Sequence, residues 1–256
     1  MTTWIKPLRL PVCFLASLLA IVGFRASGIS ILWPAVISVL FIASATMLQN
    51  DYRDRCHDSH KGKLLATQHP NIFLVFLLIF WTGACILILI TLLQERSAGI
   101  VLVIMALLGL IYSEFRKIPL TPIMLVAFTS ASPVLLALGT NVDKNNTIIL
   151  IFLSSAFIIF GREITKDLDD KQIDIEYKWT IPLAIGDKKS RTIAASTILI
   201  GLVIIAKISL ITWPALLIAT MGAILLIRGS RPRITRIYLN IGMALMILIY
   251  IISQGA

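Results

Sequence analysis

Charged residues are scarce in this chain of 256 residues. Asp, Glu, Lys and Arg together make up 14% of the sequence, whereas a typical soluble domain contains about 25%. Hydrophobic residues reach 58% and the mean hydropathy is +0.92, above the roughly 45–50% apolar content of soluble domains. This balance excludes a disordered chain, a coiled coil and an ordinary soluble enzyme.

Cysteine is scarce as well, with three residues in the chain. Cys13, Cys56 and Cys85 form no C-x-x-C pair, and their odd number argues against a disulfide framework. Cys56 is close to His57 and His60 in the sequence, but no second cluster of such ligands exists elsewhere. We therefore expect neither a disulfide nor a zinc site.

The apolar residues are gathered in long runs. Only helices and closed β-barrels satisfy their backbone hydrogen bonds in lipid, and barrel strands would alternate apolar and polar residues, which these runs do not. A membrane-spanning helix requires about 20 residues. The sequence therefore predicts one all-α polytopic membrane domain over residues 1–256, with about nine transmembrane helices at 11–29, 31–49, 72–93, 97–112, 120–139, 147–165, 190–206, 208–227 and 235–253.

Basic residues are distributed unevenly between the connecting loops. If the N-terminus is placed in the cytoplasm, only Arg25, Arg96, Lys144 and Lys207 of the 23 Lys and Arg residues fall on the opposite side. The positive-inside rule then predicts an N-in, C-out orientation. Because this topology accounts for the net charge of +10, we do not expect nucleic acid as a partner.

Acidic residues number only 13, and most of them lie in two loops on the predicted cytoplasmic side. Each loop follows a predicted helix and contains three aspartates separated by three and then four residues. The first aspartate motif is Asp51, Asp54 and Asp58, and the second aspartate motif is Asp167, Asp170 and Asp174. If each motif extends its helix, this spacing places all three carboxylates on one face.

Most runs of charge are solvated surface segments, but like charges stacked on one helix face repel one another and favour a bound cation. Two strips of carboxylate oxygens suit Mg²⁺, which substrate phosphates commonly complete. Arg162 and Lys166 lie beside the second motif, where basic side chains are suited to bind a phosphate. In a membrane, the matching substrate is a diphosphate with a lipid-soluble tail, and isoprenyl diphosphates meet this description.

The residues around the two motifs resemble the UbiA superfamily of intramembrane prenyltransferases. Asn50 together with the first motif matches the family's N-D-x-x-D-x-x-x-D signature, and the second motif matches its D-x-x-D-x-x-x-D. Residues 112–117 are similar to a Y-S segment with trailing basic residues, and residues 178–186 to a K-T-x-P…G stretch. The chain departs from many members at residues 59–63, which lack an R-P-x-R-P-like stretch.

The resemblance implies a UbiA-type helical bundle with a cytoplasm-facing cavity, and it implies roles for individual residues. The residues that would hold Mg²⁺ are Asp51, Asp54, Asp58, Asp167, Asp170 and Asp174. Those that would bind the prenyl donor are Asn50, Ser113, Arg116, Lys117, Arg162 and Lys166. The implied catalytic residues are Tyr112, Asp54 and Asp170, although Tyr112 equally fits an interfacial tyrosine of the membrane belt.

The implied activity is transfer of a prenyl group, such as geranylgeranyl or farnesyl, from a polyprenyl diphosphate to a lipophilic acceptor in the membrane. Residues 162–170 are similar to the R-E-x-x-K-D-x-x-D of geranylgeranylglyceryl phosphate geranylgeranyltransferases, which favours a prenylglycerol phosphate acceptor. Aromatic acceptors of the hydroxybenzoate, homogentisate or naphthoate type, and a non-catalytic isoprenoid-binding relative, stay open. We expect a multi-pass protein of the cell membrane, in contact with membrane lipid, with a cytoplasmic active site and no obligate protein partner.

Overall fold

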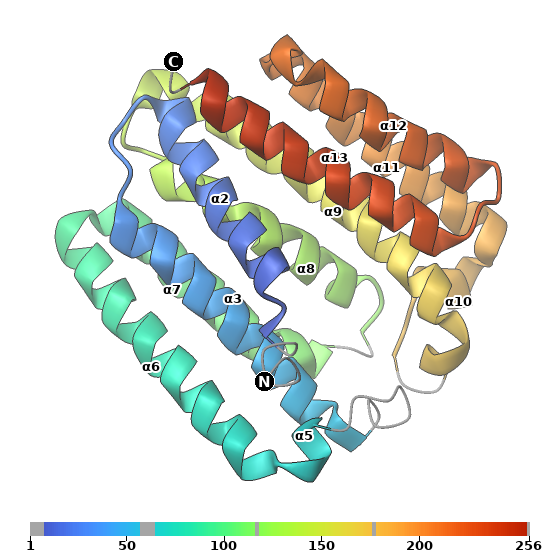
Figure 1. The fold of residues 1–256 in the computed structure, drawn as a ribbon, viewed down its shortest axis with the longest axis horizontal. Helices are drawn as coiled ribbons and strands as arrows, with labels where there is room; N and C mark the ends of the chain where they lie inside the picture. Colours follow the sequence, from blue (N-terminus) through green and yellow to red (C-terminus); the bar gives the residue numbers. More distant parts are fainter. Residues whose placement is uncertain (1–7, 57–64, 116–117, 176–177, 255–256) are drawn as a thin grey trace.

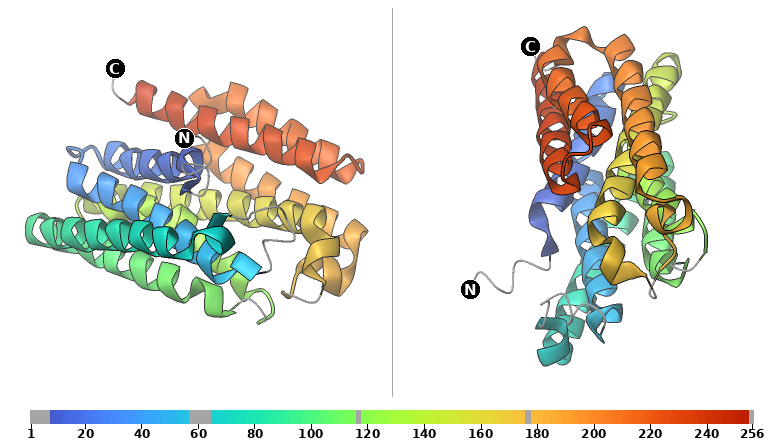
Figure 2. Two further views of the ribbon diagram at one scale, coloured as in Figure 1. Left: turned by 60° about the horizontal axis from the view of Figure 1, so that its bottom comes forward. Right: turned by 90° about the vertical axis from the view of Figure 1, so that its right-hand side faces the viewer.

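The computed structural model describes residues 8–56, 65–115, 118–175 and 178–254. Within these ranges all regular secondary structure is helical, and the long helices lie side by side in a bundle (Figures 1 and 2). The α-helices are α2 (Leu10–Ser27), α3 (Trp33–Arg53), α5 (Leu65–Gln68), α6 (Pro70–Gln94), α7 (Arg96–Ile111), α8 (Thr121–Ala131), α9 (Asn145–Asp174), α10 (Ile181–Ile185), α11 (Asp187–Ile208), α12 (Trp213–Ile227) and α13 (Pro232–Ser253). Short 3-10 helices between them are η2 (Tyr112–Phe115), η3 (Ser132–Ala137), η4 (Val142–Lys144) and η5 (Leu210–Thr212).

Seven helices of the described chain are long and apolar enough to cross a membrane. They are α2, α3, α6, α9, α11, α12 and α13, where α9 is counted with η4 and α12 with η5. Two further apolar helices, Arg96–Ile111 and Thr121–Ala137, are shorter. All nine lie where the sequence predicts a span. Seven of them meet the length and composition needed to cross a membrane, so the count of nine stays a prediction.

The predicted span 120–139 is divided because of a proline. Helix α8 ends at Ala131 and the chain continues as η3, in which Pro133 follows Ser132. Proline has no N–H group and its ring clashes with the preceding turn, so it disfavours a continuous α-helix. The resulting 3-10 segment packs closely on α2, where a Cβ at Gly23 would overlap the carbonyl oxygen of Val134.

Helix α9 is the longest helix of the bundle and packs closely against α11. Two glycines permit this approach: a Cβ at Gly161 would lie 2.5 Å from the Ala194 carbonyl oxygen, and one at Gly201 would lie 2.7 Å from the Ser154 carbonyl oxygen. The Ser154 hydroxyl donates a hydrogen bond of 2.8 Å to the Gly201 carbonyl. Small residues and interhelical hydrogen bonds are typical of helix pairs in membranes, and here they hold the helix that carries the second aspartate motif.

The ends of the helices separate the loops into two groups. Helix α2 begins near the end of the bundle that carries α5 and α10, whereas α13 finishes at the opposite end (Figure 1). Termini at opposite ends fit an odd number of passes. The end with α5 and α10 also carries the ends of α3 and α9, and therefore both aspartate motifs (Figure 1).

Candidate active site

The second aspartate motif lies entirely on the last turns of α9, as its spacing predicts. Asp167 and Asp174 are buried and Asp170 is half-buried. One lysine contacts two of these carboxylates, since Lys178 Nζ lies 2.7 Å from Asp167 Oδ1 and 3.2 Å from Asp174 Oδ2. This shared contact confirms that the first and third aspartates of the motif face the same side.

A backbone contact fixes Lys178 at the end of α9. Its backbone N–H donates a hydrogen bond of 3.2 Å to the Asp174 carbonyl, which holds the residue against the helix end. Burial alone would lower the pKa of the Lys178 ammonium, but the carboxylates of Asp167 and Asp174 outweigh burial and hold the pKa above its usual value. Lys178 is therefore a permanent positive charge between two motif carboxylates.

The first aspartate motif extends its helix with an interruption that the spacing does not predict. Helix α3 ends at Arg53, so Asp51 lies in the last helical turn while Asp54 is the capping residue, whose N–H donates to the Asn50 carbonyl at 2.9 Å. The chain is helical again at Arg55 and Cys56, so Asp54 interrupts the helix for a single residue. Asp51 and Asp54 are buried, and Asp58 lies outside the described residues.

A basic residue from the start of the bundle reaches the first motif. Arg9, just before α2, places its Nη2 2.8 Å from Asp51 Oδ1 and its Nη1 3.5 Å from the Met47 sulfur. The Arg9 backbone has a φ of 46°, a left-handed conformation that costs energy for a residue with a side chain. The ion pair with Asp51 is one contact that offsets this cost.

The η2 turn connects the surroundings of the two motifs. Glu114 of this turn forms an ion pair with Arg53 at the end of α3. Tyr112, in the same turn, lies within electrostatic range of four charged residues of or beside the second motif, namely Lys166, Glu163, Lys178 and Asp167. The structure thus places Tyr112 near the charged residues of the second motif, and its catalytic role stays a prediction. The side chain of Ser113, together with Arg116 and Lys117, lies outside the described part of the chain.

Arg162 and Lys166, the expected phosphate ligands on α9, are both paired with Glu163. Arg162 Nη1 lies 2.6 Å and Lys166 Nζ 3.3 Å from the Glu163 carboxylate, whose side chain is only 10% exposed. Arg162 Nε also donates to Asn240 Oδ1 of α13 at 2.8 Å. Sequence analysis did not assign Glu163, although its spacing of three residues from Lys166 is a recognisable pairing signal.

Other polar contacts attach this end of α9 to neighbouring elements. Arg236 of α13 forms an ion pair with Asp169. The Gln49 amide of α3 donates to the Leu110 carbonyl of α7 at 2.8 Å, and its oxygen accepts from the Trp81 indole N–H at 3.2 Å. Polar groups of α3, α7, α9 and α13 therefore fix the geometry around both motifs.

The acidic residues fit a divalent cation that shares its ligands with a substrate. Over the ranges that the structure describes, no three His, Cys, Asp or Glu residues are grouped closely enough to hold a metal. Mg²⁺ retains several waters and is completed by phosphate oxygens, so fewer than three carboxylates could hold it together with a substrate. The ammonium of Lys178 already occupies a position between two buried carboxylates, so the second motif accommodates a cation there.

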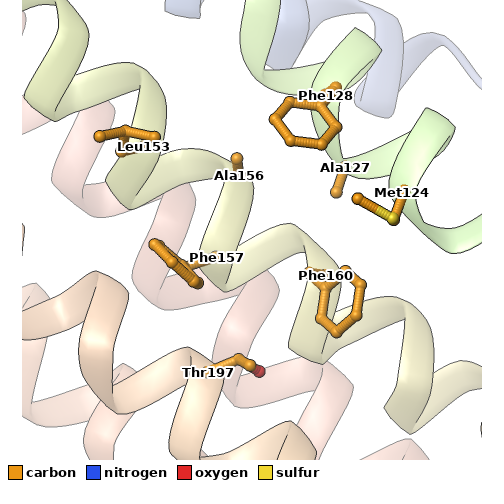
Figure 3. A pocket seen from close by; sticks show the side chains of 8 residues that line it. All are labelled: Met124, Ala127, Phe128, Leu153, Ala156, Phe157, Phe160 and Thr197. Atoms are coloured by element: carbon orange, nitrogen blue, oxygen red, sulfur yellow. The ribbon is translucent and has the colours of Figure 1, made fainter. Parts of the chain in front are cut away.

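An apolar groove lies beside the same helix. It encloses about 190 Å³ between α8, α9 and α11 (Figure 3). The residues that line it are apolar except for one threonine: Met124, Ala127, Phe128, Leu153, Ala156, Phe157, Phe160 and Thr197. Phe160 precedes Asp167 by seven residues, which corresponds to two helical turns, so both lie on similar sides of α9 about 10 Å apart along its axis.

Comparison with known families identifies the class of protein. The model of the UbiA prenyltransferase family matches residues 10–248, which is nearly the whole chain. The chain therefore belongs to the UbiA prenyltransferase family and is an enzyme that transfers prenyl groups. Its apolar helices are accordingly those of a multi-pass membrane protein. A search of curated proteins gives no match.

Solved structures share the fold over the full chain. A structure of digeranylgeranylglyceryl phosphate synthase is 21% identical, with a TM-score of 0.72, and the match covers 99% of this chain and 98% of that one. A UbiA homologue from Archaeoglobus fulgidus bound to GPP and Mg²⁺ is 16% identical, with a TM-score of 0.69 and coverage of 99% and 100%. The same homologue bound to DMAPP and Mg²⁺ is 15% identical, with a TM-score of 0.68 and coverage of 98% for both chains.

Proposed function

We propose that this enzyme transfers a prenyl group from a polyprenyl diphosphate to a lipophilic acceptor within the membrane, with Mg²⁺ as cofactor. The observation that carries the proposal is the placement of both aspartate motifs at one end of an apolar bundle (Figure 1), with the η2 turn paired to α3 and within range of α9. The homologue structures with GPP or DMAPP and Mg²⁺ support this choice of donor and metal.

The proposed roles follow from the positions of the side chains. Mg²⁺ held by the motifs would neutralise the departing diphosphate and so ease cleavage of the bond between the prenyl carbon and oxygen. Arg162 and Lys166 are placed on α9 to bind phosphate oxygens by exchanging Glu163 for the substrate. Tyr112 is within electrostatic range of Lys166, and we place the reacting prenyl carbon near it, at the junction between the polar end and the apolar helices.

The apolar bundle would hold the prenyl tail and keep water away from the reacting carbon. We place part of this tail in the groove shown in Figure 3, because the groove is apolar and follows the same helix that carries Asp167. A diphosphate at the second motif would then lie at the polar end of α9, with its tail directed along the helix.

For the acceptor we propose a prenylglycerol phosphate. The sequence Arg162–Asp170 resembles enzymes that use such an acceptor, and the similar structure of digeranylgeranylglyceryl phosphate synthase supports this choice. We further propose that the chain acts as one domain of nine membrane helices with its N-terminus and active site on the cytoplasmic side. The excess of basic residues in the loops of that end supports the orientation.

The test is a transfer assay with the protein purified in detergent. Geranylgeranyl or farnesyl diphosphate, Mg²⁺ and a panel of glycerol phosphate and aromatic acceptors are combined, and diphosphate release and prenylated product are measured. We expect product with a prenylglycerol phosphate. Absence of transfer with every donor and acceptor would contradict the proposal. Product with aromatic acceptors alone would contradict the prenylglycerol phosphate acceptor and leave the prenyl transfer in place.

The aspartate motifs are tested by Asp54→Ala and Asp170→Ala, each of which should abolish transfer. The matched control is Asp143→Ala, because Asp143 is an exposed aspartate of η4, just before the start of α9 and at the far end of that helix from the motif. Full activity in both motif variants would contradict the proposed site.

A further inference from the structure

Each aspartate motif is contacted by a basic residue that does not belong to the motif. Arg9 precedes α2 and reaches Asp51, 42 positions later in the sequence. Lys178 follows α9 and bridges Asp167 and Asp174. These two cations lie outside the motifs, and the function proposed above gives them no role.

The contacts are close and partly shielded from water. The side chains of Asp51, Asp167 and Asp174 are 9%, 4% and 1% exposed, and those of Arg9 and Lys178 are 32% and 21% exposed. Buried carboxylates require a compensating charge, and removing the partner of a buried pair leaves an uncompensated charge. A metal that approaches these carboxylates must therefore displace a positive charge that is already paired with them.

We propose that Arg9 and Lys178 are competing cations, which neutralise the two aspartate motifs before the donor arrives and so weaken metal binding to the empty site. Metal would bind well only together with a diphosphate, whose negative charge offers Arg9 and Lys178 new partners as they leave the carboxylates. This inference rests on the proposed function, since it assumes that the motifs hold the metal of the reaction. It assigns a positioning role to two residues that need not touch the reacting atoms.

Lys178 is the sharper position for a test because one ammonium contacts two carboxylates. Mn²⁺ serves as the probe, and its binding to the detergent-purified protein is measured by electron paramagnetic resonance without any diphosphate. Because the carboxylates would lose their compensating charge, we expect Lys178→Met to bind Mn²⁺ at least about tenfold more tightly than the wild type. Lys178→Arg retains the charge and should keep the weak binding of the wild type.

The matched control is Lys171→Met. Lys171 follows Asp170 directly on α9. It pairs at 2.6 Å with Asp187, whose side chain is 55% exposed. This substitution removes the same charge from the same end of the bundle without freeing a motif carboxylate. Exposed pairs interact weakly, so Mn²⁺ binding should stay within about twofold of the wild type.

The first motif is tested in the same way with Arg9→Met, which should also tighten Mn²⁺ binding. Lys178→Gln provides a second variant in case the methionine substitution prevents folding, and circular dichroism checks each variant. Unchanged or weaker Mn²⁺ binding in folded Lys178→Met or Lys178→Gln would overturn the inference.

A failure of the inference can be told apart from a failure of the proposed function. If the wild type transfers prenyl groups with Mg²⁺ but the variants bind Mn²⁺ no more tightly, the competition by Arg9 and Lys178 is refuted and the proposed function is not. Wild-type protein that neither transfers prenyl groups nor binds Mn²⁺ in the presence of inorganic diphosphate refutes both.

Discussion

Close contact between α9 and α11 should make Gly161 sensitive to even one added methyl group. In Gly161→Ala the new Cβ would lie 2.5 Å from the Ala194 carbonyl oxygen, about 0.9 Å short of the 3.4 Å at which ordinary van der Waals contact begins. The obstacle is backbone, and Ile198 and Thr197 side chains lie at 2.6 and 2.7 Å. The two helices must therefore separate locally to admit the methyl group.

The magnitude follows from two opposing contributions. Overpacking a filled interior typically costs 1–3 kcal/mol, and a backbone obstacle favours the upper part of this range. Replacing glycine by alanine in a helix interior returns about 1 kcal/mol of helix propensity. We therefore expect Gly161→Ala to lower the free energy of unfolding by about 2 kcal/mol, which corresponds to a fall in Tm of about 4–8 °C for a chain of this size.

The assay is thermal unfolding in detergent, together with prenyl transfer, which should decrease because α9 carries the second aspartate motif. Gly83→Ala is the matched control, since its new Cβ would overlap the ring of Phe41. The obstacle there is the ring of a side chain rather than backbone, so a change of the Phe41 torsion angles should relieve the overlap at lower cost, although the ring also packs on Phe80. Equal Tm values for Gly161→Ala and the wild type, or an equal loss in both variants, would refute the reasoning.

Three further outcomes are expected. Gln49→Leu leaves the Leu110 carbonyl and the Trp81 indole N–H without their partner and should destabilise the protein by about 1–3 kcal/mol, as measured by thermal unfolding; an unchanged Tm would contradict this. Removal of divalent cations with EDTA should abolish prenyl transfer, and Mg²⁺ should restore it; activity that survives EDTA would exclude a metal-dependent reaction. Carboxylates hold the pKa of Lys178 above its usual value, so its ion pairs stabilise the folded protein. This stability is fully present below the unfolded pKa of about 10.4, and it is lost only as the pH rises through the higher folded pKa. The difference in unfolding free energy between the wild type and Lys178→Gln should thus stay constant between about pH 7 and pH 9, and a decrease over this range would argue against the pairing.

The helical architecture could be predicted because it depends on local composition. Runs of apolar residues have to form helices in lipid, and helices occur at every predicted position. The places where the prediction fails are those where local chemistry changes the backbone. Pro133 divides the fifth run into α8 and η3, and the turn residue Asp54 interrupts the helical chain directly after α3.

The aspartate motifs could also be found in the sequence, because their spacing repeats. Lys178 is four residues from Asp174 and so has a local pairing signal, but pairs between distant segments could not be predicted because they depend on the tertiary arrangement. Arg9 and Asp51 are separated by 42 positions, and Arg53 and Glu114 by 61. Glu163 is an intermediate case, because its neighbours in the sequence are also its partners in space.

These pairings have a consequence for how the substrate enters. At the end of the bundle that carries both aspartate motifs, the basic residues suited to a diphosphate, Arg162 and Lys166, are paired with Glu163. The motif carboxylates suited to a metal are paired with Arg9 and Lys178. Neither a metal nor a diphosphate alone can enter without leaving one charge of such a pair uncompensated at the edge of the membrane, which is costly. A metal–diphosphate complex brings both signs of charge at once, so each displaced residue gains a new partner as it loses the old one. The donor should therefore bind as its metal complex, and either component alone should bind weakly.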